Sequence, residues 1–474
     1  MTFDTPAPPL PAPAPGRRPM VLLLGLILLA DLLFWRETPG LSLALFAVAL
    51  FAASLASPPR LASPPSLAAP PSLATPPRLA ALVTLTLALL PVVEYVQPLS
   101  LAILGLGLLA SLALQHGAPL SATISLATQI PTRAARDPGR ASRSLQGQDI
   151  ASQTRRFGRN WTLPLGGLLL LIALLAEANP VLDTWLQDVA DLPFDPALWV
   201  ERLLFWTGTA LLVWPLVVAM PTAPPSRTLS PLNPAAFGLN AASVANALIL
   251  FNIALAVQTL LDARYLWAGT TPPGMSLAAY AHRGAYPLLA TALLAGAFAL
   301  AARPFVATRP LLKPLLHLWL AQNILLTLSA LYRLDLYVRT CGLTYLRAHA
   351  AIWMALVALG LTLTLWQVAR NHSATWLLLR CAALGTATLY LAAFVNFADL
   401  IARTNIAVGK IDTAYLCALG PTAAASVPRL AWQDDDPKTD RLCTLTPPHI
   451  DGWRDWGFRN WRVLNSLAQQ EVRP

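Results

Sequence analysis

The sequence has little charge for its length. Of its 474 residues only 12% are Asp, Glu, Lys or Arg, and 56% are hydrophobic, whereas soluble domains carry roughly a quarter charged residues. A soluble protein of this composition would lack the polar groups needed to cover its surface, but a lipid bilayer solvates apolar outer faces. The shortage of charge therefore argues against a soluble enzyme and predicts an integral membrane protein.

The signatures of common catalytic and metal sites are also missing. The sequence contains no GxxxxGK[ST] phosphate loop, no HExxH zinc pair and no GxSxG nucleophile elbow. Its four cysteines, Cys341, Cys381, Cys417 and Cys443, form no CxxC pair. We therefore predict no catalytic residue, no metal and no cofactor.

Long apolar runs dominate what is present. A helix crosses the hydrocarbon core in about 20 residues and satisfies its own amides in lipid. The unbroken run at 168–175 lacks the alternation of a transmembrane β-strand. We predict an all-α polytopic transmembrane helix bundle of about eleven spans. The spans lie near 20–35, 40–56, 79–95, 98–114, 161–178, 198–220, 242–261, 285–302, 314–331, 348–368 and 375–395.

Two of these spans have alternatives. The run at 20–35 follows Arg17 and Arg18 and resembles a signal peptide, but a retained span is favoured because no small-x-small cleavage site follows. The run at 242–261 contains Asn246, Asn252 and Gln258, so a helix lying in the membrane interface is the alternative there.

Composition also divides the chain into segments. Residues 57–78 repeat a Pro-Pro hexapeptide, and paired prolines predict an extended linker. The segments are a Pro/Ala-rich disordered N-terminus (1–19), the first four spans with that linker (20–114), an Arg-rich loop (115–160), the remaining spans (161–395) and a C-terminal extramembrane tail containing a short helix (396–474).

The arginines of the 115–160 loop predict the orientation. Basic residues in short loops mark the cytoplasmic side, so this loop is expected inside, with the N-terminus inside and the C-terminus outside. Arg333, Arg339 and Arg347 run against this scheme because it places them outside. The net charge of +10 is explained by this bias, and we expect the lipid bilayer and no nucleic acid as partner.

The predicted orientation assigns roles to the cysteines. Cys417 and Cys443 would both lie in the outer tail, where disulfides persist. They are the candidate pair for a bridge, and Cys341, also outside in this scheme, is a possible competitor. Cys381 lies within the last span and is expected to be a small buried residue.

Polar residues gather at the predicted outer ends of the later spans. Two acid–base pairs are four residues apart, the spacing that brings side chains together on a helix. If the spans pack together, the polar residues converge on one outward-facing cleft; the alternative is a set of interfacial ion pairs. The residues of this candidate cluster are Asp262, Arg264, Tyr280, His282, Arg283, Arg333, Asp335, Arg339, Asp399 and Arg403.

Several unusual strings indicate a family. They include Ala279-Tyr280-Ala281-His282-Arg283-Gly284, Leu331-Tyr332-Arg333-Leu334-Asp335-Leu336-Tyr337 and Asn396-Phe397-Ala398-Asp399-Leu400-Ile401-Ala402-Arg403. In these the chain resembles bacterial membrane proteins known as domain of unknown function 4173, with a relative known as 4153. The resemblance implies an α-helical protein of the bacterial inner membrane and no activity.

Three functions therefore compete. The first is a transporter or permease, which predicts deep polar side chains facing an internal cavity. The second is a non-catalytic scaffold or sensor that docks a protein partner through its tail, which carries Trp432, Trp453, Trp456 and Trp461. The third is a membrane-embedded enzyme acting on an envelope or lipid-linked substrate, which predicts a pocket open to lipid beside His282 and Asp335.

Overall fold

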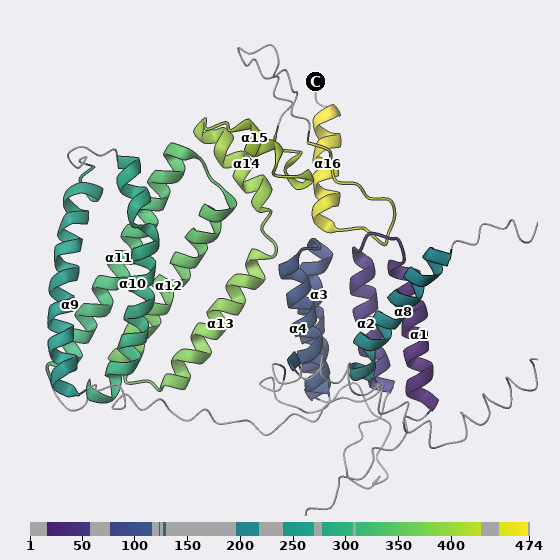
Figure 1. The fold of residues 1–474 in the computed structure, drawn as a ribbon, viewed down its shortest axis with the longest axis horizontal. Helices are drawn as coiled ribbons and strands as arrows, with labels where there is room; N and C mark the ends of the chain where they lie inside the picture. Colours follow the sequence, from purple (N-terminus) through teal and green to yellow (C-terminus); the bar gives the residue numbers. More distant parts are fainter. Residues whose placement is uncertain are drawn as a thin grey trace, which may run out of the picture. The chain divides into compact units, whose positions relative to one another are not determined.

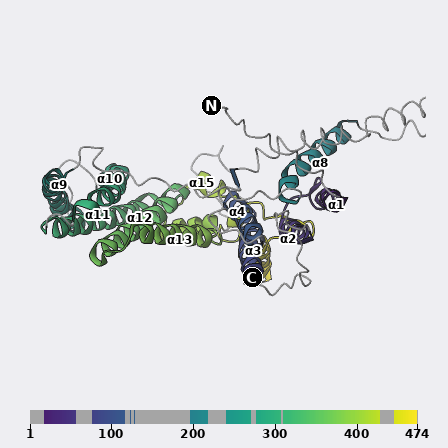
Figure 2. The same ribbon diagram turned by 90° about the horizontal axis from the view of Figure 1, so that it is seen from below.

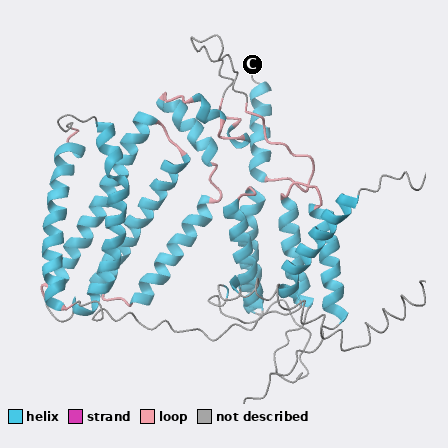
Figure 3. Ribbon diagram, in the orientation of Figure 1, coloured by secondary structure: helices cyan, strands magenta, loops and turns pink. Residues whose placement is uncertain are grey.

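The computed structural model describes most of the helical part of the chain. The described residues are 17–56, 76–115, 123, 127–128, 196–217, 240–269, 277–306, 310–427 and 445–472. Within these ranges every regular element is a helix (Figure 3), as the apolar runs predict. The predicted span at 161–178, most of the Arg-rich loop and residues 57–75 of the linker lie outside the described residues.

The chain forms two compact units. One comprises Met1–Ser226 with Asp451–Trp456, and the other comprises Arg227–Ile450 with Gly457–Pro474. Each is described by itself below.

The first unit packs five described helices around an apolar core. Leu50, Leu112 and Val213, from three different helices, are fully buried there. The helices are α1 (Arg17–Phe34), α2 (Leu41–Ala56), α3 (Pro76–Glu94), α4 (Pro98–Gln115) and α8 (Pro196–Val217) (Figure 1).

The start of α3 corrects the predicted linker. Pro76 and Pro77, the last proline pair of the repeat, are the first two residues of this helix. Proline is tolerated in the first helical turn because the N–H groups there have no intrahelical acceptor. The prediction that the linker extends to residue 78 was therefore wrong.

The second unit is centred on α11. This helix packs against α9, α10 and α12, and Figures 1 and 2 show it between α9 and α12. Leu312, Leu316 and Leu320 lie on its buried face. The elements are α9 (Ala241–Leu261), the π-helix η2 (Asp262–Trp267), α10 (Leu277–Val306), α11 (Leu312–Cys341), α12 (Tyr345–Arg370) and α13 (Ala374–Ala392).

The second unit ends in a smaller group of elements that we call the C-terminal module. It consists of α14 (Phe397–Val408), α15 (Thr413–Cys417), η3 (Pro421–Ala423) and α16 (Phe458–Val472). Ile401, Leu416 and Ala423 form its small apolar core. At 12, 5, 3 and 15 residues these helices are too short to cross a bilayer.

Seven described helices are long and apolar enough to cross a membrane. Their outer faces carry exposed leucines such as Leu204, Leu250 and Leu379, which are 65–67% exposed, as expected where lipid is the solvent. The helices are Pro76–Glu94, Pro98–Gln115, Ala197–Val217, Ala241–Trp267, Leu312–Cys341, Tyr345–Arg370 and Ala374–Ala392. Shorter apolar helices occupy Met20–Phe34, Leu41–Ala56 and Leu293–Val306. The chain is thus a membrane protein, and the figure of about eleven spans stays a prediction.

Two polar side chains of α9 donate hydrogen bonds within the unit. The Asn252 side chain donates to the Leu248 carbonyl at 2.8 Å and to the Leu315 carbonyl at 3.1 Å. Gln258 donates to the Asp262 carboxylate at 2.9 Å. This arrangement favours a spanning helix packed along α11 over one lying in the interface.

Candidate functional site

Two deeply buried charges of the second unit form an ion pair. Asp262 is 1% exposed and Arg333 4%, and the guanidinium donates to the carboxylate. Asp262 begins η2, where the helix switches to wider π-type bonding; the Ala268 N–H, for example, donates to the Ala263 carbonyl. The predicted span ends at residue 261, so Asp262 was expected beyond it, but the helix continues to Trp267 without a break.

Other predicted residues lie at the same end of these helices. Asp335 and Arg339 form the expected one-turn ion pair at 2.8 Å, with side chains 49% and 70% exposed. Arg264 is exposed on η2. Tyr280, His282 and Arg283 lie on α10, but their side chains are outside the described part of the structure.

The C-terminal module is fixed to the turn between α11 and α12. The Asn405 side chain accepts a hydrogen bond from the Leu343 N–H at 2.5 Å and donates to the Leu343 carbonyl at 3.0 Å. Gly342 has φ of +78°, and a Cβ there would lie 3.0 Å from the Asn405 oxygen. The Tyr345 N–H also donates to the Tyr415 hydroxyl at 3.0 Å.

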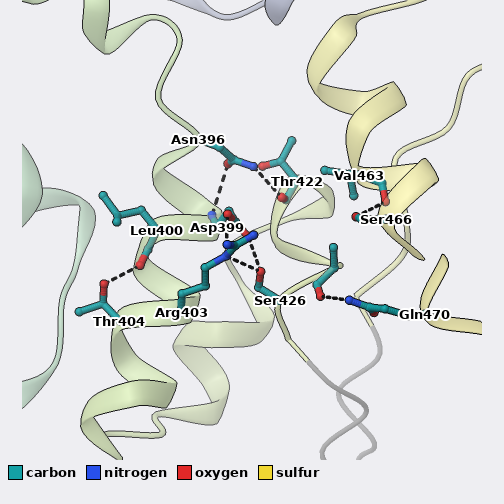
Figure 4. Close-up of polar contacts among 11 residues, drawn as sticks. Asn396, Asp399, Leu400, Arg403, Thr404, Thr422, Ser426, Val463, Ser466 and Gln470 are labelled. Atoms are coloured by element: carbon teal, nitrogen blue, oxygen red, sulfur yellow. Dashed lines mark hydrogen bonds and ion pairs between the residues drawn. The ribbon is translucent and has the colours of Figure 1, made fainter. Parts of the chain in front are cut away.

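Within the module a polar network joins α14 to the segment after η3. Asp399 pairs with Arg403 at 3.0 Å, one helical turn away. The Ser426 hydroxyl lies between them, accepting from Arg403 Nε at 3.1 Å and donating to Asp399 (Figure 4). Asn396 caps α14 and donates to the Thr422 carbonyl at 2.9 Å.

Helix α16 completes the site with residues spaced three and four apart. Arg459, Arg462, Ser466 and Gln470 share one face by that spacing. Arg459 is 3% exposed and donates to the Ala393 carbonyl at 3.0 Å, and Gln470 donates to the Ala425 carbonyl at 3.1 Å. These bonds hold α16 against the end of α13 and the segment after η3.

A cavity of about 240 Å³ lies between α14 and α16. Its walls combine the Asp399–Arg403 network with the arginine face of α16. Asn396, Asp399, Arg403, Ala425, Arg459, Arg462, Val463 and Ser466 line it. Figure 4 shows Asn396, Asp399, Arg403 and Ser466 around this region.

The cavity contains part of the predicted cluster. Asp399 and Arg403 line it, whereas Asp262 and Arg333 form a separate buried pair and Asp335 and Arg339 a separate exposed one. The single cleft that would unite all the predicted residues stays a prediction. Sequence reasoning missed Arg459 and Arg462, although their spacing along α16 was a signal that could have identified them.

The cysteines fall into two kinds. Cys417, at the end of α15, is disulfide-bonded. Cys341 and Cys381 are free, the first exposed and the second half-buried in α13. Cys443, the predicted partner of Cys417, lies outside the described residues.

The first unit has an ion pair of its own, which is partly exposed. Arg202 on α8 donates to Asp31 on α1, and Trp206 Nε1 donates to the same carboxylate at 2.8 Å. The guanidinium also lies within 5.5–5.8 Å of the ring centres of Trp35, Trp199 and Trp206. The pair and its rings fasten α8 to α1, which is a structural role.

Comparison with known proteins identifies a family but no individual similar protein. The model of the family described as Domain of unknown function (DUF4153) matches residues 23–430. No curated protein and no solved structure matches the chain. Of the two related families that the unusual strings resemble, the match is thus to domain of unknown function 4153, and membership of domain of unknown function 4173 is not shown.

Proposed function

The chain belongs to the family described as Domain of unknown function (DUF4153), which names no activity, and we propose from its geometry that it is a membrane-anchored binding protein, a sensor or scaffold without chemistry of its own. The C-terminal module lies outside the membrane in this proposal and holds the ligand. The observation that carries it is the cavity between α14 and α16, whose lining includes Asp399 and three arginines.

The deep polar side chains support this choice over a transporter. Transport calls for polar groups that face an internal cavity at membrane depth. Asn323 is fully buried on α11 and donates to the Trp319 carbonyl at 2.8 Å, and Thr327 donates to the Asn323 carbonyl at 2.8 Å. Asn252 donates to the Leu248 carbonyl of its own helix and to the Leu315 carbonyl of α11. These donors are thus bonded to backbone carbonyls, and the bond from Asn252 to Leu315 joins two helices.

An enzyme is less well supported for a similar reason. The enzyme hypothesis requires a pocket beside His282 and Asp335. Asp335 is half-exposed and paired with Arg339, and the side chain of His282 lies outside the described part of the structure.

Two observations favour an outer location for the module. Disulfides persist in oxidising compartments outside the cytosol, and Cys417 is disulfide-bonded. The opposite end of the same helices carries Arg303, Lys313 and Arg370, with Arg303 donating to the His372 carbonyl and Lys313 to the Ala369 carbonyl. Basic residues at that end are expected on the cytoplasmic side. Arg333, Arg339 and Arg347 lie at the module's end and run against this assignment, so the disulfide is the stronger of the two observations.

Thiol labelling tests both parts of the proposal. In a Cys341→Ser background, Ser466→Cys places a thiol in the cavity wall, and Asn465→Cys places a matched thiol on the exposed side of the same helix. A membrane-impermeant maleimide should label both in intact cells. An occupant retained in native membranes should slow the labelling of residue 466 relative to 465, and purification with extensive washing should remove that difference.

Labelling that requires permeabilised cells would place the module inside and overturn the outer location. A 466-to-465 labelling ratio that is the same in native membranes and in washed protein would overturn the binding function. A reporter that functions only in the cytoplasm can also be fused after Pro474. Activity of this fusion would place the C-terminus inside and would contradict the orientation independently.

A further inference from the structure

Basic side chains of three helices meet at the turn that joins α12 to α13. This turn lies at the end of the second unit opposite the C-terminal module (Figure 1). Arg303 on α10 donates to the His372 carbonyl, and Lys313 on α11 donates to the Ala369 carbonyl at 3.4 Å. Arg370 itself belongs to the last turn of α12. The turn therefore gathers positive charge from α10, α11 and α12.

Two arginines beside this turn lie on indole rings, an arrangement in which the ring attracts the cation. The Arg370 guanidinium lies 5.0 Å from the centre of the Trp366 ring, one helical turn earlier on α12. The Arg380 guanidinium lies 3.9 Å from the centre of the Trp376 ring on α13. The Trp376 ring stacks on the His372 ring with centres 4.4 Å apart, so this stack connects Arg380 to the same turn.

The backbone of the turn is held in one conformation. Asn371 has φ of +56° and ends α12, and the Ser373 hydroxyl caps α13 by accepting from the Trp376 N–H at 3.1 Å. The Gln367 side chain is 1% exposed and donates to the Ser373 carbonyl at 3.1 Å. The His372 N–H donates to the Gln367 carbonyl at 3.0 Å. The basic groups are therefore preorganised, which lowers the entropic cost of binding a ligand.

These positive charges have no acidic partner among the described residues, whose ion pairs all involve other arginines. The sequence contains no Asp or Glu between Asp262 and Asp335, and none between Asp335 and Asp399. Those three acids lie at the other end of the helices or in the C-terminal module. The end near the α12–α13 turn therefore carries an excess of positive charge. The residues that supply it are Arg303, Lys313, Arg370 and Arg380.

The two tryptophans and Arg380 lie at the depth of the membrane surface. Helix α13 is a candidate membrane span that begins at Ala374, and Arg380 is exposed on it about 9 Å along the axis. Helical side chains lean toward the helix N-terminus, so the guanidinium extends toward the lipid headgroups. Trp366 is 52% exposed on the neighbouring span, and tryptophan is typical of this layer.

We infer that this end of the second unit binds the phosphate headgroup of an anionic phospholipid, held by the exposed guanidinium groups of Arg370 and Arg380. Guanidinium forks fit phosphate oxygens in pairs, and basic clusters between membrane helices suit acidic headgroups. A soluble phosphate has the same oxygens, but a lipid brings them to the depth of Arg380. The inference is independent of the binding function proposed for the C-terminal module.

Lipid titration of the full-length protein, purified in a detergent without net charge, tests the inference. Native mass spectrometry counts the retained lipid molecules, and thermal unfolding in mixed micelles measures the stabilisation that they provide. Phosphatidylglycerol should bind saturably and raise the unfolding temperature, whereas phosphatidylcholine, which has no net charge, should do neither at the same concentration. Sodium phosphate should displace no more phosphatidylglycerol than sodium chloride of equal ionic strength.

The double variant Arg370→Gln/Arg380→Gln should raise the half-saturating concentration of phosphatidylglycerol roughly tenfold or more, because each basic residue beside the headgroups contributes several-fold. Its unfolding temperature without lipid should stay nearly unchanged, since both side chains are exposed. Arg370→Lys/Arg380→Lys keeps the charges, loses the forks and should give an intermediate value. Arg339→Gln removes an exposed arginine at the opposite end of the same helices and should leave lipid binding unchanged.

Three outcomes would overturn the inference. The first is equal binding of phosphatidylglycerol and phosphatidylcholine, and the second is binding that the double glutamine variant leaves unchanged or that Arg339→Gln weakens as much. The third is displacement of the lipid by sodium phosphate beyond the effect of sodium chloride, which would identify a site for soluble phosphate instead.

Discussion

Asp262 and Arg333 form a buried ion pair between the end of α9 and the last turns of α11. The two residues are 71 positions apart in the sequence, and both are nearly inaccessible to solvent. Gln258 donates to the same carboxylate from one turn earlier. The pair therefore fixes the register of α9 against α11 at the end of the bundle nearest the C-terminal module.

Replacing one member of this pair should destabilise the protein far more than replacing both members. Asp262→Ala or Arg333→Ala leaves one charge buried, and each should destabilise the protein by about 3–5 kcal/mol. The double variant Asp262→Leu/Arg333→Met leaves no buried charge and should recover most of the loss. Thermal unfolding in detergent measures the stability of each variant relative to the unchanged protein.

The exposed Asp335–Arg339 pair provides the control. Asp335→Ala should leave the unfolding temperature almost unchanged because half-exposed ion pairs contribute little. Equal effects of Asp335→Ala and Asp262→Ala would contradict the assignment of the buried pair as the register-setting contact.

Asn405 should govern how firmly the C-terminal module is held. Asn405→Ala leaves the N–H and carbonyl of Leu343 without the amide that now satisfies both, and an unsatisfied buried group costs about 1–3 kcal/mol. Hydrogen exchange at Leu343 should accelerate roughly tenfold or more, with the core amides of α11 unchanged. Thr404→Ala, on the exposed side of the same helix, is the matched control, and equal acceleration in both variants would refute this role.

The bond of Cys417 should go to Cys443. Of the four cysteines in the sequence two are free, so Cys443 is the one left to pair with Cys417. Peptide mapping without reductant should yield a 417–443 crosslinked peptide, and alkylation should modify Cys341 and Cys381. A bridge across a loop of this length contributes about 3 kcal/mol, so Cys417→Ser should lower the unfolding temperature, and reductant should then have no further effect. A crosslinked peptide containing Cys341 would disprove the pairing.

The helices could be predicted because their signal is local. Each long apolar run within the described residues became a helix, and the one-turn spacing of Asp335 with Arg339 and of Asp399 with Arg403 was enough to predict both ion pairs. The error at Pro76 was also local, because a rule for helix interiors was applied to a helix start.

The site could be predicted only in part because it joins distant segments. Asp399 and Arg403 lie on α14, but the arginines that complete the cavity lie on α16, more than fifty residues later. No spacing rule connects segments so far apart. In the same way the partner of Asp262 on α11 could not be chosen from the arginines near that end of the bundle, because the choice depends on how α9 and α11 pack.

Gly40 should be essential to the first unit for a reason that composition does not reveal. The segment Asp451–Trp456 belongs to this unit and lies on the start of α2. The Leu41 N–H donates to the Trp456 carbonyl at 2.9 Å and the Ser42 N–H to the Arg454 carbonyl at 3.2 Å. These are first-turn N–H groups with no acceptor inside the helix, so residues near the end of the chain cap a helix near its start.

A Cβ at position 40 would overlap the backbone of Asp455, and backbone cannot move aside as a side chain can. Gly40→Ala should therefore displace the capping segment at a cost of about 1–3 kcal/mol, and hydrogen exchange at Leu41 and Ser42 should accelerate accordingly. Gly25→Ala on α1, where nothing lies within 4 Å of the added carbon, makes the same chemical change and should be neutral or slightly stabilising. Unchanged exchange at Leu41 in Gly40→Ala would mean that the segment does not cap α2.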